Sequence, residues 1–358
     1  MTKKILKMKI LLKRIILRVI QRKDIFMLLL LYILCRQMII YMRKRKKLLK
    51  IKKLNRKSLI TFSGGGQLGF YYQGICAYLR DNFDLTDVRF AGISIGATAA
   101  ASLADDLPTD VSMIFGFRWF ELLQKRKLKT FFVGTQEFLD IMVKVAKDFG
   151  MSDELIKLRF ENNKDKLYFG VTNISKWPAE HELISDFTTL NESFHAMSCS
   201  MRIFPFFCCP AGLYKNKVLI DGGFSKMFSV PYDQDKSKII YVTPVPSNIV
   251  KADIQPNVHS YPYQTFKLKH FFQIPTLEWV FEQFTRGYND AMKSRYILIN
   301  KGIPIKKELN GCFQYKLDTH LEMLKKYSSI IFKNNNGNSH EYTKFKQSLK
   351  NIYQPKLY

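Results

Sequence analysis

A serine stands between two glycines at Gly92-Ile93-Ser94-Ile95-Gly96, and this pentapeptide constrains the fold more than any other part of the sequence. The run Val88–Ala91 before it predicts a short buried strand, and the small residues Ala97–Leu103 after it predict a helix packed closely behind the turn. Gly92 and Gly96 flank the serine because a turn this tight leaves no room for side chains. The pattern predicts an α/β fold that holds the Ser94 hydroxyl between the end of a strand and the start of a helix.

A second glycine turn lies upstream, between the apolar run Ser58–Phe62, which predicts a buried strand, and a helical pattern over Phe70–Leu79. Its glycine spacing is also that of a dinucleotide-binding turn. That interpretation requires an acidic residue about 20 residues further on to hold a ribose. The next strand leads instead into the Ser94 turn, which disfavours a nucleotide-binding protein.

Backbone N–H groups that converge at the start of a helix can equally stabilise an oxyanion. We therefore expect this loop to form an oxyanion hole next to Ser94. The expected donors are Gly64, Gly65 and Gly66, and Gly69 is expected to support the turn.

A serine hydroxyl becomes an effective nucleophile when a base accepts its proton. The histidines do not stand in recognisable strand-end turns; they are His181, His195, His259, His270, His320 and His340. Asp221 is the better candidate, because the apolar run Val218–Ile220 delivers its carboxylate to the double-glycine turn Gly222-Gly223. By itself, such a sequence is usually only a turn in which the aspartate accepts local hydrogen bonds. With Ser94 present, we predict a catalytic pair of Ser94 and Asp221.

The formal net charge of +27 is concentrated at the start of the chain, where Asp24 is the only acid before Lys57. Over residues 3–22, basic side chains fall on one side of a helix and aliphatic side chains on another, as in helices that lie on anionic membranes. Because large aliphatic rather than aromatic residues separate the basic ones, we expect no specific nucleic-acid partner. A core helix with solvated basic ends remains the alternative.

The apolar segment 25–42 follows this basic stretch and contains Arg36. A membrane span needs about 20 apolar residues, so this segment is marginal as a transmembrane helix. We expect residues 1–57 to be a membrane-associating tail, attached at the surface or through a single pass, with the catalytic domain facing the cytosol.

Together these motifs resemble the patatin-like phospholipases, and most closely the animal acylglycerol-lipase (adipose triglyceride lipase-like) branch. The resemblance covers roughly Leu59–Arg295 and includes the segment Met197–Phe206 ahead of the Asp221 strand. It departs from the family at Phe224–Val230, where the family often has asparagines before a proline. The resemblance implies a three-layer α/β/α sandwich with a mostly parallel sheet, a Ser–Asp dyad without histidine, and no calcium requirement.

The resulting hypothesis is a serine lipid acyl hydrolase that cleaves fatty-acyl esters of phospholipids or acylglycerols. We expect an apolar site, with Phe204, Phe206 and Phe224 as candidate walls, to raise the pKa of Asp221. The six cysteines lack paired spacing, so no metal site and no cofactor is expected. The alternative is a catalytically silent lipid-binding or scaffold protein of the same fold.

The expected organisation is a tail over residues 1–57, a catalytic domain over 58–300 and a C-terminal region of weak pattern over 301–358. The motifs leave open which lipid ester is cleaved, whether water or another acceptor takes the acyl group, and the oligomeric state.

Overall fold

A computed structural model describes residues 57–126, 135–148, 152–203, 209, 211–246, 249–256 and 276–333. The expected tail, apart from Lys57, and the end of the expected C-terminal region lie outside these ranges. Among the helices described, none has the length and apolarity needed to span a bilayer. The candidate segment 25–42 lies outside the described residues.

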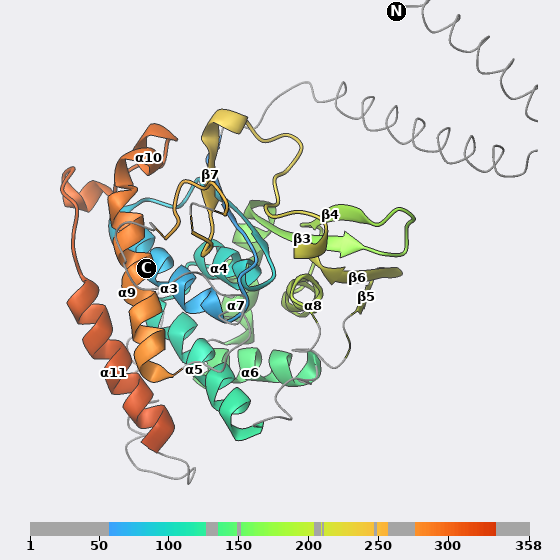
Figure 1. Cartoon of the computed structure of the whole chain (residues 1–358), viewed down its shortest axis with the longest axis horizontal. Helices are drawn as coiled ribbons and strands as arrows, with labels where there is room; N and C mark the ends of the chain where they lie inside the picture. Colours follow the sequence, from blue (N-terminus) through green and yellow to red (C-terminus); the bar gives the residue numbers. More distant parts are fainter. Residues whose placement is uncertain are drawn as a thin grey trace, which may run out of the picture. The chain divides into compact units, whose positions relative to one another are not determined.

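The strands form one mixed sheet in the order β5-β6-β3-β2-β1-β7, with β4 also paired to β3 (Figure 1). Strand β1 pairs in parallel with β2 and β7, and β2 pairs in parallel with β3. The other three pairings are antiparallel, so the expectation of a mostly parallel sheet is wrong for β4, β5 and β6. Short turns join β3 to β4 and β5 to β6, and such turns connect antiparallel strands. The strands are β1 (Leu59–Phe62), β2 (Arg89–Ile93), β3 (Leu167–Asn173), β4 (Glu180–Ile184), β5 (Gly212–Tyr214), β6 (Lys217–Asp221) and β7 (Ile239–Val242).

Helices pack on one face of the sheet, where Ile60, Phe62, Phe90 and Phe169 are buried in the main core. Helix α4 packs on β1, β2 and β3, and α8 packs on β3, β5 and β6. Helix α3 packs on α4, α5 and α9, and α11 packs on α5 and α9 (Figure 1). These helices are α3 (Gly69–Asn82), α4 (Ile95–Ala104), α5 (Thr109–Arg126), α6 (Thr135–Asp148), α7 (Asp153–Asn163), α8 (Leu190–Ser200), α9 (Leu277–Lys293), α10 (Arg295–Asn300) and α11 (Leu317–Lys333).

The other face of the sheet carries a small core of Leu59, Ala91 and Ile239. The irregular segment 225–235 covers it: the Thr61 hydroxyl donates to the Ser229 carbonyl at 2.8 Å, and Val230 packs on the small core. A second helical layer on this face, as in the expected three-layer sandwich, is not seen among the described residues. Segment 225–235 lies directly on the sheet here, since a Cβ on Gly170 would stand 1.8 Å from Ser229 Oγ.

Helices α3 and α9 cross with their backbones almost in contact. A Cβ added to Gly74 would lie 2.0 Å from the Phe284 carbonyl oxygen, and one added to Gly287 would lie 1.9 Å from the Tyr71 carbonyl oxygen. Residues larger than glycine would force the two helices apart. This close crossing holds α3, and with it the glycine loop that precedes α3, against the rest of the core.

Candidate active site

Ser94 occupies the sharp turn that the sequence predicts. Strand β2 ends at Ile93 and α4 begins at Ile95, and Ser94 between them has φ 55° and ψ −132°. A non-glycine residue in such a backbone conformation costs on the order of 1–3 kcal/mol, so the surrounding structure must hold it. The close packing explains the two glycines: a Cβ on Gly92 would lie 2.2 Å from the Gly96 oxygen, and one on Gly96 would lie 2.4 Å from the Ser63 oxygen.

Strand β3 brings Ser94 and Asp221 to the same place. Strand β2 runs parallel to β3 and pairs Ile93 with Gly170, while β6 runs antiparallel to β3 and pairs Asp221 with Val171. Strands β2 and β6 therefore approach each other end to end along one side of β3. Each strand finishes where the other finishes, so Ser94 and Asp221 lie next to each other although they are far apart in sequence.

The end of α8 and the residues just after it connect these two strand ends. The Ser94 N–H donates to both the carbonyl and the hydroxyl oxygen of Ser200, each at 3.1 Å, and the Asp221 N–H donates to the Arg202 carbonyl at 3.1 Å. The Ser200 hydroxyl donates to the Gly170 carbonyl at 2.7 Å. Sequence reasoning assigned no role to Ser200 and Arg202, because neither an isolated serine hydroxyl nor a backbone carbonyl forms a motif that identifies these contacts.

The Asp221 carboxyl group is buried, with 3% of the residue exposed. Its Oδ1 accepts a hydrogen bond from the Gly223 N–H at 2.7 Å. Its Oδ2 is buried without a partner in full hydrogen-bond geometry, although the Ser94 hydroxyl is near enough to lower the carboxyl pKa. Burial has the larger effect and raises the pKa of Asp221 to about 6.

The predicted rise in the Asp221 pKa is confirmed, but one of its predicted causes is wrong. The Phe224 side chain is 64% exposed and does not enclose the carboxyl group, while Phe204 and Phe206 lie outside the described residues. The Gly222-Gly223 turn after Asp221 instead packs directly on β3, since a Cβ on Gly222 would stand 2.2 Å from the Gly170 oxygen. Close backbone packing therefore excludes water from Asp221.

The glycine loop lies against the Ser94 turn. A Cβ on Gly64 would stand 3.3 Å from Ser94 Cβ, and a Cβ on Gly69 would stand 2.5 Å from Ile95 Cγ1. Gly66 has φ 53° and begins a short 3-10 turn that leads into α3. Within the described residues, the N–H groups of Gly64, Gly65 and Gly66 donate to no protein acceptor. The loop therefore has backbone donors available close to Ser94.

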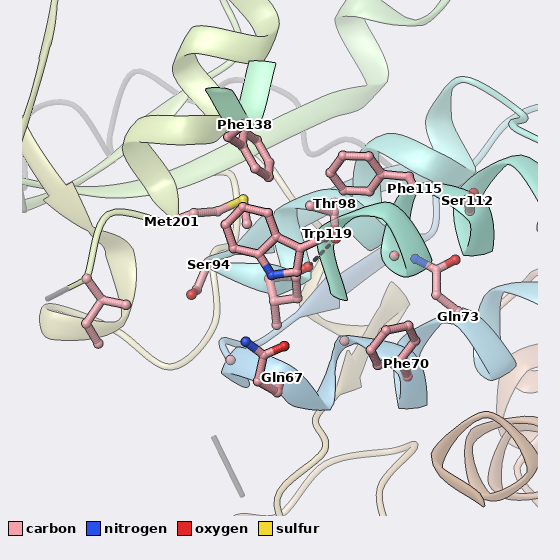
Figure 2. Close-up of a pocket in the computed structure, with 15 residues that line it drawn as sticks. Gln67, Phe70, Gln73, Ser94, Thr98, Ser112, Phe115, Trp119, Phe138 and Met201 are labelled. Atoms are coloured by element: carbon pink, nitrogen blue, oxygen red, sulfur yellow. Dashed lines mark hydrogen bonds between the residues drawn. The ribbon is translucent and has the colours of Figure 1, made fainter. Parts of the chain in front are cut away.

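A largely apolar pocket opens beside Ser94 (Figure 2). It contains about 720 Å³ of space outside the atoms, part of which is open to solvent. Its apolar walls come from four helices and from the segment after α8; they include Phe70, Ile95, Phe115, Trp119, Phe138 and Met201. Figure 2 shows Ser94 at one end of this pocket and Gln73 with Ser112 at the other. A hydrocarbon chain attached to a group at Ser94 fits such walls.

The three described histidines all have other neighbours. His181 is hydrogen-bonded to the hydroxyls of Ser225 and Ser229, and His320 to Asp81. His195 packs against the Tyr214 ring. In the part of the chain that the structure describes, no histidine contacts Ser94, and no group of three or more potential metal ligands is found.

Comparison with known proteins agrees with this arrangement. The sequence model of the patatin-like phospholipases matches residues 60–233, which run from β1 past the Asp221 turn. The chain carries a domain of the patatin-like phospholipase family. The family resemblance drawn from the sequence is thereby confirmed.

The chain has animal relatives of low identity. It is 27% identical to the mouse (Mus musculus) omega-hydroxyceramide transacylase over 250 residues, 65% of this chain and 40% of the relative. It is 27% identical to the human (Homo sapiens) patatin-like phospholipase domain-containing protein 2 over 267 residues, 69% of this chain and 50% of the relative. The match therefore spans half or less of the length of these relatives. Among solved structures, VipD from Legionella pneumophila aligns over 83% of this chain and 80% of its own, with 12% identity and a TM-score of 0.42.

Proposed function

We propose that this protein is a serine lipid acyl hydrolase that cleaves fatty-acyl esters of phospholipids or acylglycerols. The arrangement of Ser94 carries the proposal: the residue stands in a strained turn, next to the buried Asp221 carboxyl group and at the end of an apolar pocket. A carboxyl group whose pKa is raised to about 6 is a better proton acceptor than an exposed aspartate, yet it is ionised at neutral pH. Family membership supports an enzyme that acts on lipid acyl groups.

The proposed reaction proceeds in two steps. Asp221 accepts the Ser94 proton as Oγ attacks the ester carbonyl, and the N–H groups of the Gly64–Gly66 loop hold the oxyanion. The tetrahedral intermediate then collapses, and the leaving alcohol takes the proton from Asp221. Water attacks the resulting acyl-serine while Asp221 accepts its proton, and Ser94 recovers that proton as the fatty acid leaves. Each oxyanion donor contributes about 2.7–4 kcal/mol in enzymes of this kind.

Acyl transfer to an alcohol is the second candidate. Two mouse relatives support it by name, the omega-hydroxyceramide transacylase and the 1-acylglycerol-3-phosphate O-acyltransferase Pnpla3, the latter 29% identical over 175 residues, 48% of this chain and 40% of the relative. The first step is the same in both reactions. Hydrolysis and transfer differ only in whether water or an acceptor hydroxyl attacks the acyl-serine.

A fluorophosphonate probe tests the proposal, because it labels an activated serine whatever the natural lipid is. We expect the probe to label the wild-type protein, and Ser94→Ala and Asp221→Asn to lose both labelling and ester hydrolysis. Because the two residues act as one unit, the double variant should lose little more than either single variant. The matched control is Ser329→Ala, a serine whose hydroxyl bonds within its own helix α11, and it should keep wild-type labelling.

If the folded wild-type protein is neither labelled nor active on any fatty-acyl ester, the hydrolase proposal is refuted. That result would favour the alternative, a catalytically silent lipid-binding or scaffold protein. Labelling that survives in Ser94→Ala would refute the assignment of the nucleophile. Product analysis with and without added glycerol or monoacylglycerol separates hydrolysis from transfer, since only transfer yields a new ester.

We also propose that residues 1–57 attach the domain to membranes, on the sequence pattern alone. Deleting them should abolish sedimentation with anionic vesicles but preserve turnover of a soluble short-chain ester. Salt screens electrostatic attachment beyond about 8 Å at physiological ionic strength and leaves buried apolar contacts intact. Release by high salt would therefore indicate surface attachment, whereas retention in salt and alkaline carbonate would indicate insertion of segment 25–42. A full-length protein that never sediments with anionic vesicles would refute the proposal.

A further inference from the structure

The pocket beside Ser94 does not end at its inner wall. A second cavity shares four of its lining residues, Gln73, Thr98, Ser112 and Phe115, and continues away from Ser94. The second cavity, which we call the inner chamber, is lined beyond these shared residues by parts of α4, α5, α6, α7 and α8. A lipid chain that starts at Ser94 and passes Phe115 would enter this chamber.

The inner chamber differs from the first pocket in its chemistry. Apolar side chains such as Val111, Met142 and Phe194 form part of its wall, as an acyl chain requires. Its lining also includes Asp105 and Arg159, and an apolar chain uses neither group. The Arg159 guanidinium lies near the backbone, with Nη1 at 3.4 Å from the Asp105 carbonyl oxygen.

Two buried oxygens in the walls of these cavities have no hydrogen-bond partner in the described structure: Gln73 Oε1 and Asp105 Oδ1. Gln73 lies at the junction of the two cavities, and Asp105 lies in the inner chamber. A buried polar atom without a partner costs about 1–3 kcal/mol. Burial also raises the pKa of the Asp105 carboxyl to about 7, against the opposing effect of Arg159. Among the described residues, neither oxygen therefore has a hydrogen-bond donor.

Two serine hydroxyls in the wall of the inner chamber can also hydrogen-bond to a polar group of a ligand. The Ser112 and Ser102 hydroxyls are 2.6 Å apart, and both residues line the inner chamber. A ligand hydroxyl has one hydrogen to donate and two lone pairs to accept with, so it can satisfy an unpartnered oxygen and accept from a serine. A carboxylate has no hydrogen to donate and would face the Asp105 carboxyl. An ammonium group would be buried near Arg159 at a large desolvation cost.

We propose that the inner chamber binds a hydroxyl group carried by the lipid acyl chain, with the Asp105 carboxyl group as its hydrogen-bond acceptor. This proposal rests on the proposed function, because the acyl chain enters the chamber from Ser94. It narrows the substrate class to fatty-acyl esters that are hydroxylated away from the carbonyl group.

The test compares para-nitrophenyl palmitate with counterparts hydroxylated at mid-chain or at the chain end. Wild-type kcat/KM should favour at least one hydroxylated ester by about 10- to 100-fold, as a hydrogen bond to a charged or acidic buried group provides. In Asp105→Leu, which has nearly the same shape without the polar group, this ratio should fall towards one. Asp105→Asn keeps an oxygen that accepts and should retain part of the preference.

Asp106→Asn is the matched control, because Asp106 is the exposed neighbour of Asp105 and is also close to Arg159. Its ratio of hydroxylated to plain ester should equal that of the wild type. Chemical unfolding of every variant checks that a changed ratio is not a failure to fold.

A binding experiment separates this inference from the proposed function. Displacement of a fluorescent fatty acid from the wild-type protein measures the affinities of palmitic acid and its hydroxylated forms without any turnover. Tighter binding of a hydroxylated form, lost in Asp105→Leu, supports the hydroxyl site even if no ester is hydrolysed. Equal affinities and equal kcat/KM values would overturn the hydroxyl site and indicate that water satisfies these oxygens, while leaving the hydrolase proposal intact.

Discussion

Replacing Asp221 by asparagine should change how the stability of the protein depends on pH. Burial raises the pKa of Asp221 from 3.8 to about 6, so the folded protein releases this proton less readily than the unfolded chain. The stabilising contribution of the protonated group is complete below about pH 3.8 and is lost as pH rises through about 6. A difference of about two pKa units corresponds to about 3 kcal/mol of unfolding free energy. Asparagine stays neutral and does not incur this loss.

The free energy of unfolding, measured by urea titration, should therefore favour Asp221→Asn over the wild type increasingly as pH rises. We expect the difference between the two proteins to grow by about 2–3 kcal/mol between pH 4 and pH 8, with about half of the full effect present at pH 5. Because only the change of this difference with pH is compared, any effect of the amide group that does not depend on pH cancels. Asp165→Asn, at an exposed aspartate, is the control, and its difference from the wild type should stay within about 0.5 kcal/mol. A difference for Asp221→Asn that stays flat or narrows with rising pH would refute the raised pKa.

Three further predictions follow from the structure. The kcat/KM for a soluble ester should fall below an apparent pKa of about 6, roughly 100-fold by pH 4, because Asp221 must be ionised to accept a proton; a pH–rate profile checks this. Gly74→Ala should lower the unfolding free energy by about 1–3 kcal/mol, although alanine favours helices, because its Cβ would stand 2.0 Å from the Phe284 oxygen. The stability of Asp105→Leu relative to the wild type, measured by urea titration, should rise by at most about 4 kcal/mol from pH 4 to pH 8. The reason is that burial raises the Asp105 pKa from 3.8 to about 7, so the wild type loses stability over this range.

The turn around Ser94 was predictable because its requirements are local. Glycine is needed wherever backbone approaches backbone, and apolar runs on either side identify the strand and the helix. The same logic identified the strand that ends at Asp221. The mixed sheet was not predictable in this way, because the pairing of β6 with β3 depends on register between distant segments rather than on the pattern within either one.

The sequence did not predict which groups enclose the Asp221 carboxyl group. Phe224 is apolar and adjacent in sequence, yet its side chain is largely exposed, and the backbone of β3 encloses the carboxyl group instead. The unpartnered oxygens of Gln73 and Asp105 had no signature in the sequence either. A glutamine in one helix and an aspartate at the end of another have no recognisable pattern until packing brings them to connected cavities.

By itself, the sequence determined the two glycine turns, the strands and helices next to them, the candidate nucleophile and base, and the family. These features follow from backbone sterics and short-range periodicity, which act within a few residues of each other. Only the tertiary structure decided that Ser94 and Asp221 meet, because they converge through their separate pairings with β3. It also decided the Asp221 pKa and the inner chamber, because desolvation depends on every atom packed around a group and not on its neighbours in the chain.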